Sequence, residues 1–307
     1  MRRFQILAPL LMVAALLAAG CATEEPTNNT DAAADTASMG INYTGDFSGP
    51  LGLQLWSIRD SMQRDIAGTL AWVREQGFEE VELAGTYNLS PAQFRAQLDS
   101  AGLQASAMHA PFERMRDGLN GVLDEAEVLG VEYVGVAWIP HEEENPFTVD
   151  MARETAALFN TWGQAASERG LKFFYHTHGY EFEPAADGEV PFDVLIEETD
   201  PEDVAYEMDV FWVAHPGVDP AALLRKYPNR WALMHIKDMK QGTPTGDYSG
   251  HAPAEAQVPV GSGQIDYAEV LAAAEEVGVK RYYVEDESPD PRGNIPTSVS
   301  WLASAKY

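Results

Sequence analysis

The chain has few of the residues on which several classes of protein depend. It has one cysteine, Cys21, so a disulfide framework or a cysteine metal site within the chain is excluded. It has 20 Lys and Arg against 48 Asp and Glu, which gives a formal net charge of −28. Such a chain repels nucleic acid and anionic lipid surfaces. Its glycine-rich segments resemble neither a dinucleotide fingerprint nor a phosphate P-loop.

The sequence also lacks an apolar run long enough for a comfortable transmembrane span. The run at 4–19 follows two arginines and ends in small residues, an arrangement typical of a secretory signal at 1–20. The ending Ala-Ala-Gly-Cys at 18–21 resembles a bacterial lipobox, which implies lipidation of Cys21. The alternative is an ordinary cleaved signal that ends near a cysteine.

Residues 21–49 are rich in Thr, Asn, Asp, Ala and Gly and predict a disordered tether, because they offer little apolar surface to bury. Together with the signal, this tether indicates an exported protein. We expect it to be lipid-anchored in the periplasm or outer membrane of a Gram-negative bacterium. Its contact with the membrane would be made only through the anchor.

The remainder, residues 50–307, has the usual size of a single eight-stranded α/β barrel. Short apolar, β-branched or aromatic runs alternate in it with helical stretches, which is typical of parallel βα units. The sequence therefore predicts an α/β fold, a single-domain (β/α)8 TIM barrel. The predicted strands are 51–55, 80–83, 104–108, 133–137, 172–175, 204–208, 232–236 and 282–284.

Helix boundary signals support this interpretation. Ser90 and Asp219 each precede a proline, as N-caps before a proline at the first helical position. Asp266 is placed to cap a helix at 267–277 that ends before a glycine, and the longest helical stretch is 148–169. The loop at 240–264 has several glycines and is a candidate mobile cover.

Four candidate metal ligands fall near the C-terminal ends of separate late strands. They are His176, Asp209, His235 and Glu285. Because active sites collect at that end of a parallel barrel, these side chains are expected to converge on one divalent cation. Two imidazoles and two carboxylates accept Mn, Co, Zn, Ni or Mg. Taken singly, a histidine on a strand or an acid at a strand end also fits a structural or capping role.

Further polar and aromatic side chains lie at comparable positions. Aromatic walls beside hydroxyl-binding groups suit a carbohydrate, whereas core packing is the alternative for each tryptophan. The candidate substrate contacts are Glu82, His109, Glu181, Trp56, Trp138 and Trp212. The candidate catalytic groups are Glu285, His176, His178 and Lys237.

Several sequence blocks resemble the xylose isomerase-like TIM-barrel superfamily of sugar phosphate isomerases and epimerases. They include 51–60, 77–83, His-Thr-His-Gly-Tyr-Glu-Phe at 176–182, Met-Asp-Val-Phe-Trp-Val at 208–213, His-Ile-Lys-Asp-Met at 235–239 and 261–266. The resemblance implies a divalent metal held at the barrel mouth by two glutamates, an aspartate and a histidine. Asp209, His235 and Glu285 match three of these positions, whereas His176 stands where a glutamate is usual. Glu181 matches a position that contacts substrate hydroxyls in related epimerases.

The resemblance also implies removal of a proton next to a sugar carbonyl, with an enediolate stabilised by the metal. Glu285 is the first candidate base, with His176 or His178 on the other face. Lys237 is a candidate to hold a developing oxyanion or a hydroxyl, or else forms a salt bridge with Asp238 or Glu207. The compartment favours an unphosphorylated sugar, and we expect an isomerase or epimerase.

Two alternatives stay open. A 3-keto-glycoside lyase would expel a leaving group from the same enediolate, and a non-catalytic sugar-binding lipoprotein would keep the barrel and the metal. The small-molecule partner is thus a sugar or a keto-glycoside. An endonuclease of the same superfamily is set aside, because the chain is exported, strongly acidic and without a basic stripe.

Overall fold

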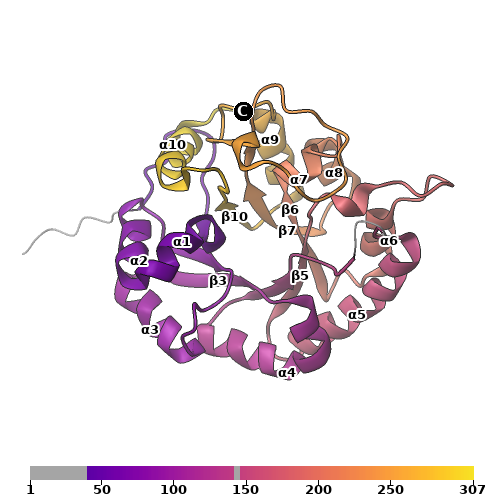
Figure 1. Ribbon diagram of the computed structural model, residues 1–307, viewed down its shortest axis with the longest axis horizontal. Helices are drawn as coiled ribbons and strands as arrows, with labels where there is room; N and C mark the ends of the chain where they lie inside the picture. The colour runs from indigo at the N-terminus through magenta and orange to yellow at the C-terminus, as the bar shows by residue number, and fades with distance from the viewer. Residues whose placement is uncertain (1–39, 142–145) are drawn as a thin grey trace, which may run out of the picture. The chain divides into compact units, whose positions relative to one another are not determined.

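The computed structural model of the protein describes residues 40–141 and 146–307. The signal, Cys21 and most of the predicted tether lie outside these residues. Eight parallel strands form a closed barrel in the order β1-β10-β7-β6-β5-β4-β3-β2 (Figure 1). They are β1 Leu51–Gln54, β2 Glu80–Leu83, β3 Gln104–His109, β4 Tyr133–Val136, β5 Lys172–His176, β6 Val204–Asp209, β7 Trp231–Ile236 and β10 Arg281–Val284. The predicted (β/α)8 barrel and all eight of its strands are confirmed.

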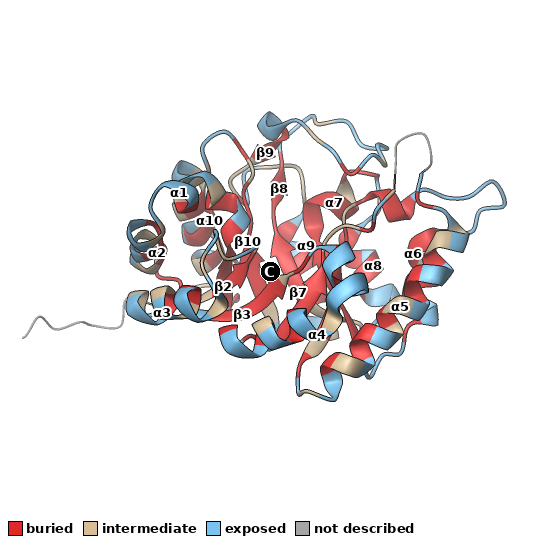
Figure 2. Cartoon of the chain, turned by 60° about the horizontal axis from the view of Figure 1, so that its bottom comes forward, coloured by how far each residue is buried: buried red, intermediate tan, exposed pale blue. Residues whose placement is uncertain are grey.

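Helices surround the barrel and turn their apolar sides toward it, as the red inner and blue outer faces in Figure 2 show. The α-helices are α1 Arg59–Arg64, α2 Ile66–Glu75, α3 Pro91–Ala101, α4 Phe112–Leu129, α5 Val149–Ser167, α6 Pro191–Glu198, α7 Val210–Ala214, α8 Pro220–Lys226, α9 Tyr267–Val277 and α10 Pro291–Ser304. Short 3-10 helices lie at η1 Leu55–Ile58, η2 Tyr180–Phe182 and η3 Ala254–Ala256. Among the described residues, no helix is both long and apolar enough to cross a membrane.

The structure contains the helix caps that were predicted from the sequence. Ser90 and Gln93 form a reciprocal capping box at the start of α3. Asp219 accepts a hydrogen bond from the Ala222 amide at 3.1 Å and so caps α8. Asp266 caps α9, which ends at Gly278 in the left-handed conformation. These caps satisfy amide and carbonyl groups that would otherwise lack partners at helix ends.

The last part of the predicted tether is folded. Residues 41–49 run beside the C-terminal end of the chain, where the Asp46 amide donates to the Ala305 carbonyl at 2.7 Å. Phe47 is buried and packs edge-to-face on Tyr282, with ring centroids 5.1 Å apart. The prediction that 41–49 are disordered is therefore wrong, because one buried aromatic residue anchors a segment whose average composition is polar.

The loop at 240–264 is fastened to the rim of the barrel. It includes β9 (Gln257–Val258), which pairs antiparallel with β8 (Asp238–Met239), and both lie above the barrel strands in Figure 2. The Asp238 carboxylate accepts hydrogen bonds from the amides of Gly261 at 2.9 Å and Gly263 at 2.8 Å. Asp238 thus orders the loop that covers one side of the barrel mouth.

Candidate metal centre and active site

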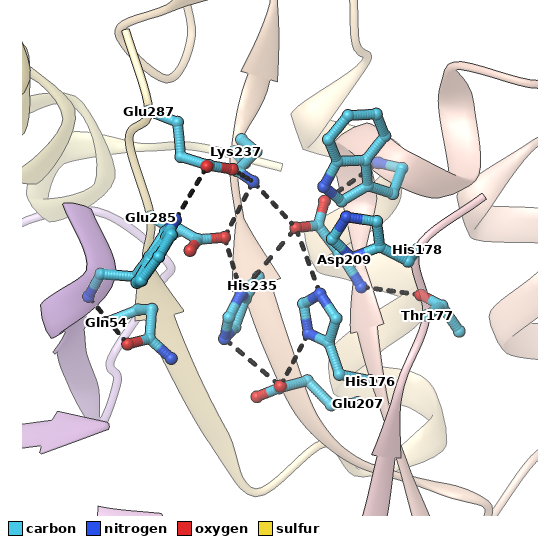
Figure 3. Close-up of polar contacts among 12 residues, drawn as sticks. Gln54, His176, Thr177, His178, Glu207, Asp209, His235, Lys237, Glu285 and Glu287 are labelled. Atoms are coloured by element: carbon cyan, nitrogen blue, oxygen red, sulfur yellow. Dashed lines mark hydrogen bonds and ion pairs between the residues drawn. The ribbon is translucent and has the colours of Figure 1, made fainter. Parts of the chain in front are cut away.

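The four predicted ligands meet at the C-terminal mouth of the barrel, where Figure 3 shows them facing one another. His176 and Asp209 end β5 and β6, His235 lies next to the last residue of β7, and Glu285 directly follows β10. All four side chains are buried. Adjacent parallel strands end at the same edge, so ligands that are far apart in the sequence become neighbours.

The spacing of the ligand atoms fits a cation. His235 Nδ1 lies 3.1 Å from Glu285 Oε2 and 3.8 Å from Asp209 Oδ2, and His176 Nε2 lies 3.9 Å from the same Asp209 oxygen. Two ligands that are each about 2.1 Å from a metal are separated by roughly 3.0–3.4 Å in octahedral or tetrahedral geometry. Asp209 Oδ2 is buried without a hydrogen bond. Asp209, His235 and Glu285 could therefore hold a metal, with His176 beside them.

Glu207 contacts one ring nitrogen of His176 and one of His235, in each case the nitrogen that faces away from the candidate metal position. Its Oε2 lies 2.9 Å from His176 Nδ1 and 3.3 Å from His235 Nε2, and Glu82 Oε2 also contacts His235 Nε2. With protons on those nitrogens, His176 Nε2 and His235 Nδ1 are free to bind a metal, as second-shell carboxylates commonly arrange. Burial raises the pKa of Glu207, but the neighbouring imidazoles outweigh it and hold the pKa well below its usual range.

A second group of possible ligands lies deeper in the barrel and consists of His109, His176, Glu207 and His235. His109 Nε2 is 3.1 Å from Glu207 Oε2 and 3.3 Å from Glu82 Oε1. Burial lowers the pKa of His109, but the two carboxylates outweigh it and raise the pKa to about 10. This group shares His176 and His235 with the predicted ligand set, and hydrogen bonds join its members. We therefore interpret His109 and Glu207 as residues that hold the two shared imidazoles in position.

Lys237 neutralises the carboxylates of the centre. Its Nζ lies 2.7 Å from Glu287, 2.8 Å from Glu285 and 3.3 Å from Asp209. The sequence suggested a salt bridge from Lys237 to Asp238 or Glu207. That prediction is wrong, because the Lys237 side chain forms ion pairs with Glu285 and Glu287. Lys237 does not line the main cavity, so its predicted contact with a substrate oxygen does not hold there.

The charge of Lys237 changes what Glu285 can do. Burial raises the pKa of Glu285, but Lys237 and His235 outweigh it and hold the pKa well below its usual range. A carboxylate with such a low pKa is a weak base. Glu285 is therefore better suited to binding a metal than to removing a proton.

His178 is an imidazole with the opposite character. Its ring stacks on Trp212, with centroids 4.8 Å apart and planes at 20°, and its Nδ1 has no hydrogen-bond partner. Burial, helped by the neighbouring positive groups, lowers its pKa well below the usual value. His178 is thus neutral at neutral pH, in contrast to the charged groups around the candidate metal centre.

A cavity of about 470 Å³ opens above the cluster. The predicted residues His109, His176, His178, Trp56 and Trp138 line it, together with His235 and Glu285. Trp56 is 44% exposed, and its Nε1 donates to Glu287 Oε2 at 3.0 Å. The cavity therefore joins aromatic walls to the candidate metal centre, in a volume typical of a small-molecule site.

Three predicted substrate contacts, Glu82, Glu181 and Trp212, are buried and do not line this cavity. Glu82 is fully buried and accepts a hydrogen bond from Gln54 Nε2 at 2.6 Å. Glu181 accepts one from the His178 amide at 2.8 Å, and burial raises its pKa to about 7. Trp212 stacks against the His178 ring. Each side chain positions a neighbour instead of facing the cavity.

The structure gives roles to residues that the sequence analysis left without one. Glu207 is two residues before Asp209, and Glu287 is two residues after Glu285. Alternate residues of a strand point to the same side, so for Glu207 and Asp209 on β6 this spacing was the available signal, whereas Glu287 lies in the loop after β10. It could not show which carboxylate binds a metal and which one supports it.

Comparison with known proteins places this site in a family. A family model described as the xylose isomerase-like TIM barrel matches residues 70–305. The chain belongs to that family. It is 24% identical over 256 residues to inosose dehydratase of Lacticaseibacillus casei, covering 75% of this chain and 84% of the relative.

Two solved structures share its fold. The structure of a sugar phosphate isomerase/epimerase from Parabacteroides distasonis has a TM-score of 0.70 at 24% identity, covering 85% of this chain and 96% of that one. The structure of the IolI protein with a zinc atom has a TM-score of 0.63 at 16% identity, covering 82% and 94%. The family resemblance and barrel expected from the sequence are confirmed.

Proposed function

We propose that the protein is a divalent-metal-dependent enzyme that removes the proton next to the carbonyl of an unphosphorylated sugar and returns it, as an isomerase or epimerase. The observation that carries this proposal is the convergence of Asp209, His235 and Glu285, whose possible ligand atoms lie within 4.8 Å of one another. His235 and Glu285 also line a cavity with aromatic walls. Burial of so many titratable groups is costly, and a divalent cation would offset part of that cost.

The metal would be held by His176, Asp209, His235 and Glu285. It would polarise the sugar carbonyl as a Lewis acid. The zinc atom in the structure of the IolI protein, which shares this fold, supports a metal in this protein. The ligand set does not select among Mn, Co, Zn, Ni and Mg, although the two imidazoles favour a transition metal over Mg.

The chain's own residues would move the proton. His178 is the better candidate base by position, because its neutral ring lines the cavity, whereas Glu285 is held by ion pairs. Trp212 stacked against its ring fixes the ring plane. Glu285, the first candidate from the sequence, is tied to Lys237 at 2.8 Å and His235 at 3.1 Å. We therefore assign it to the metal.

Elimination is a second candidate for the same site. The name inosose dehydratase, borne by a relative that matches over most of both chains, denotes an enzyme that removes water from its substrate. Proton removal next to a carbonyl is common to dehydration, to epimerisation and to 3-keto-glycoside cleavage. The three reactions differ in what happens after the proton has left, which favours one shared site for any of them.

We also propose that the protein is exported and anchored by a lipid on Cys21, in the periplasm or outer membrane. The support is the sequence pattern at 1–21. Mass spectrometry of the N-terminal peptide should show an acylated cysteine, and Cys21→Ser should release the protein from the membrane fraction. A cleaved, unmodified N-terminus would refute the anchor.

The function is tested by following solvent deuterium into a panel of free ketoses and 3-keto-glucosides by NMR. Deuterium next to the carbonyl of an intact substrate indicates an isomerase or epimerase, and loss of the aglycone or of water indicates a lyase. Asp209→Asn should abolish either reaction. Asp219→Asn is the matched control, because it lies at the cap of α8 and asparagine caps equally well. Metal and sugar binding without any turnover across the panel would favour the non-catalytic sugar-binding protein.

A further inference from the structure

A second cavity of about 440 Å³ lies beside the first. Its lining includes the aromatic and imidazole rings of Trp138, His141, Phe147, Tyr180, Tyr248 and His251. Both volumes fall in the range of small-molecule sites. The candidate metal ligands do not line this second cavity, so the chemistry proposed above leaves it unused.

One indole ring forms the boundary between the two cavities, because Trp138 lines both. On one side it meets His178 of the first cavity edge-to-face, with centroids 5.1 Å apart. It also stacks with His141 at 4.7 Å and with His251 at 5.7 Å. A molecule that passes this ring would contact both cavities.

The walls of the second cavity are fixed by contacts among its own residues. The Tyr180 hydroxyl accepts a hydrogen bond from the Ile139 amide at 2.8 Å and is bonded to Tyr175 at 3.0 Å. Gly250 has a φ of +71°, and a Cβ there would lie 3.1 Å from the Trp138 ring and 3.2 Å from Tyr180. The loop therefore approaches the indole more closely than a side chain would easily allow.

The lining indicates the class of ligand. Rings suit the C–H faces of a sugar or an aromatic aglycone, while Asp247, Ser249 and His251 offer partners for hydroxyl groups. The Ser249 amide, which donates to Asp247 at 2.8 Å, holds the pKa of that carboxyl below its usual range. A charged Asp247, with Glu183 in the same lining, repels phosphate.

We propose that this second cavity binds the second unit of an unphosphorylated glycoside, whose keto sugar occupies the cavity above the metal centre. The glycosidic bond would cross beside Trp138. This inference rests on the proposed function and narrows its substrate from free monosaccharides to glycosides. It leaves open whether the glycoside is epimerised or cleaved.

The test measures binding of sugars that lack the reactive ketone, so it does not depend on turnover. The native, metal-loaded protein is titrated with methyl glucoside and with a glucosyl-glucose disaccharide by calorimetry. The disaccharide should bind about tenfold more tightly, because it contacts a second site. In Tyr248→Ala and in the milder Asp247→Asn this preference should fall to about threefold or less.

Tyr307→Ala is the control, because Tyr307 contacts Asp46 before the first strand, at the opposite end of the barrel. Equal affinity for the two sugars in the native protein would overturn the proposal, and so would a preference that both variants retain. If the protein prefers the disaccharide but exchanges the proton of no keto sugar, the second binding site would be upheld and the enzymatic function refuted. Metal content and circular dichroism identify any variant that fails to fold.

Discussion

Replacing Lys237 by methionine removes the ammonium group that contacts Asp209, Glu285 and Glu287. Methionine keeps an unbranched stem and removes the charge. Lys237 is 1% exposed, and its Nζ lies within 3.3 Å of all three carboxylates. Loss of one partner from a buried ion pair costs about 3–5 kcal/mol, because the remaining charges stay buried without compensation. For a domain of this size that is a fall in Tm of about 10 °C in the metal-free protein.

Added divalent metal should reduce the difference in Tm between the native protein and Lys237→Met. A cation bound by Asp209 and Glu285 supplies the positive charge that the variant has lost, so the variant should gain more stability from metal than the native protein does. Thermal unfolding followed by circular dichroism, with and without metal, measures both effects.

Lys226→Met is the matched control. Lys226 contacts both oxygens of Asp193 at 2.8 Å, but its side chain is half exposed. Such a surface pair contributes about 0–1 kcal/mol. If the two variants lost equal stability without metal, or if metal left the Lys237→Met deficit unchanged, the assigned role of Lys237 would be refuted.

Three further predictions address other parts of the structure. Glu207→Gln should weaken metal binding about 10–100-fold in calorimetry, because the carboxylate orients two ligating imidazoles. Glu181 has its pKa raised by burial from 4.5 to about 7, so the folded state binds more protons within that window. The native protein should therefore lose about 3 kcal/mol relative to Glu181→Gln between pH 4 and pH 8 in chemical unfolding. Gly135→Ala should destabilise by about 1–3 kcal/mol, because a Cβ would collide with the Phe174 carbonyl, whereas Gly121→Ala in α4 meets nothing and should stabilise by about 0.5–1 kcal/mol.

Each of these has a result that would contradict it. Unchanged metal affinity in Glu207→Gln, with Glu125→Gln as a surface control, would show that the imidazoles orient themselves. A pH-independent difference between native protein and Glu181→Gln would mean that Glu181 titrates normally. Equal effects of alanine at Gly135 and Gly121 in urea unfolding would contradict the close packing of β4 against β5.

The barrel was predictable because its strands are short apolar runs that end in polar residues. His176, Asp209 and His235 fall at or next to the last residues of their strands, and Glu285 follows its own. A parallel barrel brings such ends together, so the convergence of these four side chains could be predicted from the order of the strands alone.

The supporting contacts were not predictable in this way. Whether Glu207 or Asp209 faces a metal depends on how β6 pairs with its neighbours, and its register against β7 shifts after Tyr206. The sequence does not contain that shift as a local pattern. Trp212 was predicted to line the substrate site, yet the short helix α7 places its ring in a stack with His178.

The parts of the structure formed by loops were the hardest to predict from the sequence. The second cavity is lined by residues at 138–141, 146–147 and 246–251, and β8 and Asp238 hold the long loop that contributes the last of these. The folded segment at 41–49 escaped notice for a related reason. Its stability comes from Phe47 and from hydrogen bonds to the far end of the chain, which composition does not reveal.

The central claim is that a bound divalent metal enables proton removal from a keto sugar. The most direct measurement is the rate of solvent deuterium entry next to the carbonyl of a 3-keto-glucoside, recorded while metal-stripped protein is reloaded in steps. The account predicts no exchange without metal and a rate that rises until one metal is bound per chain. Exchange at the full rate in the stripped protein, or failure of the protein to bind any divalent metal, would contradict it.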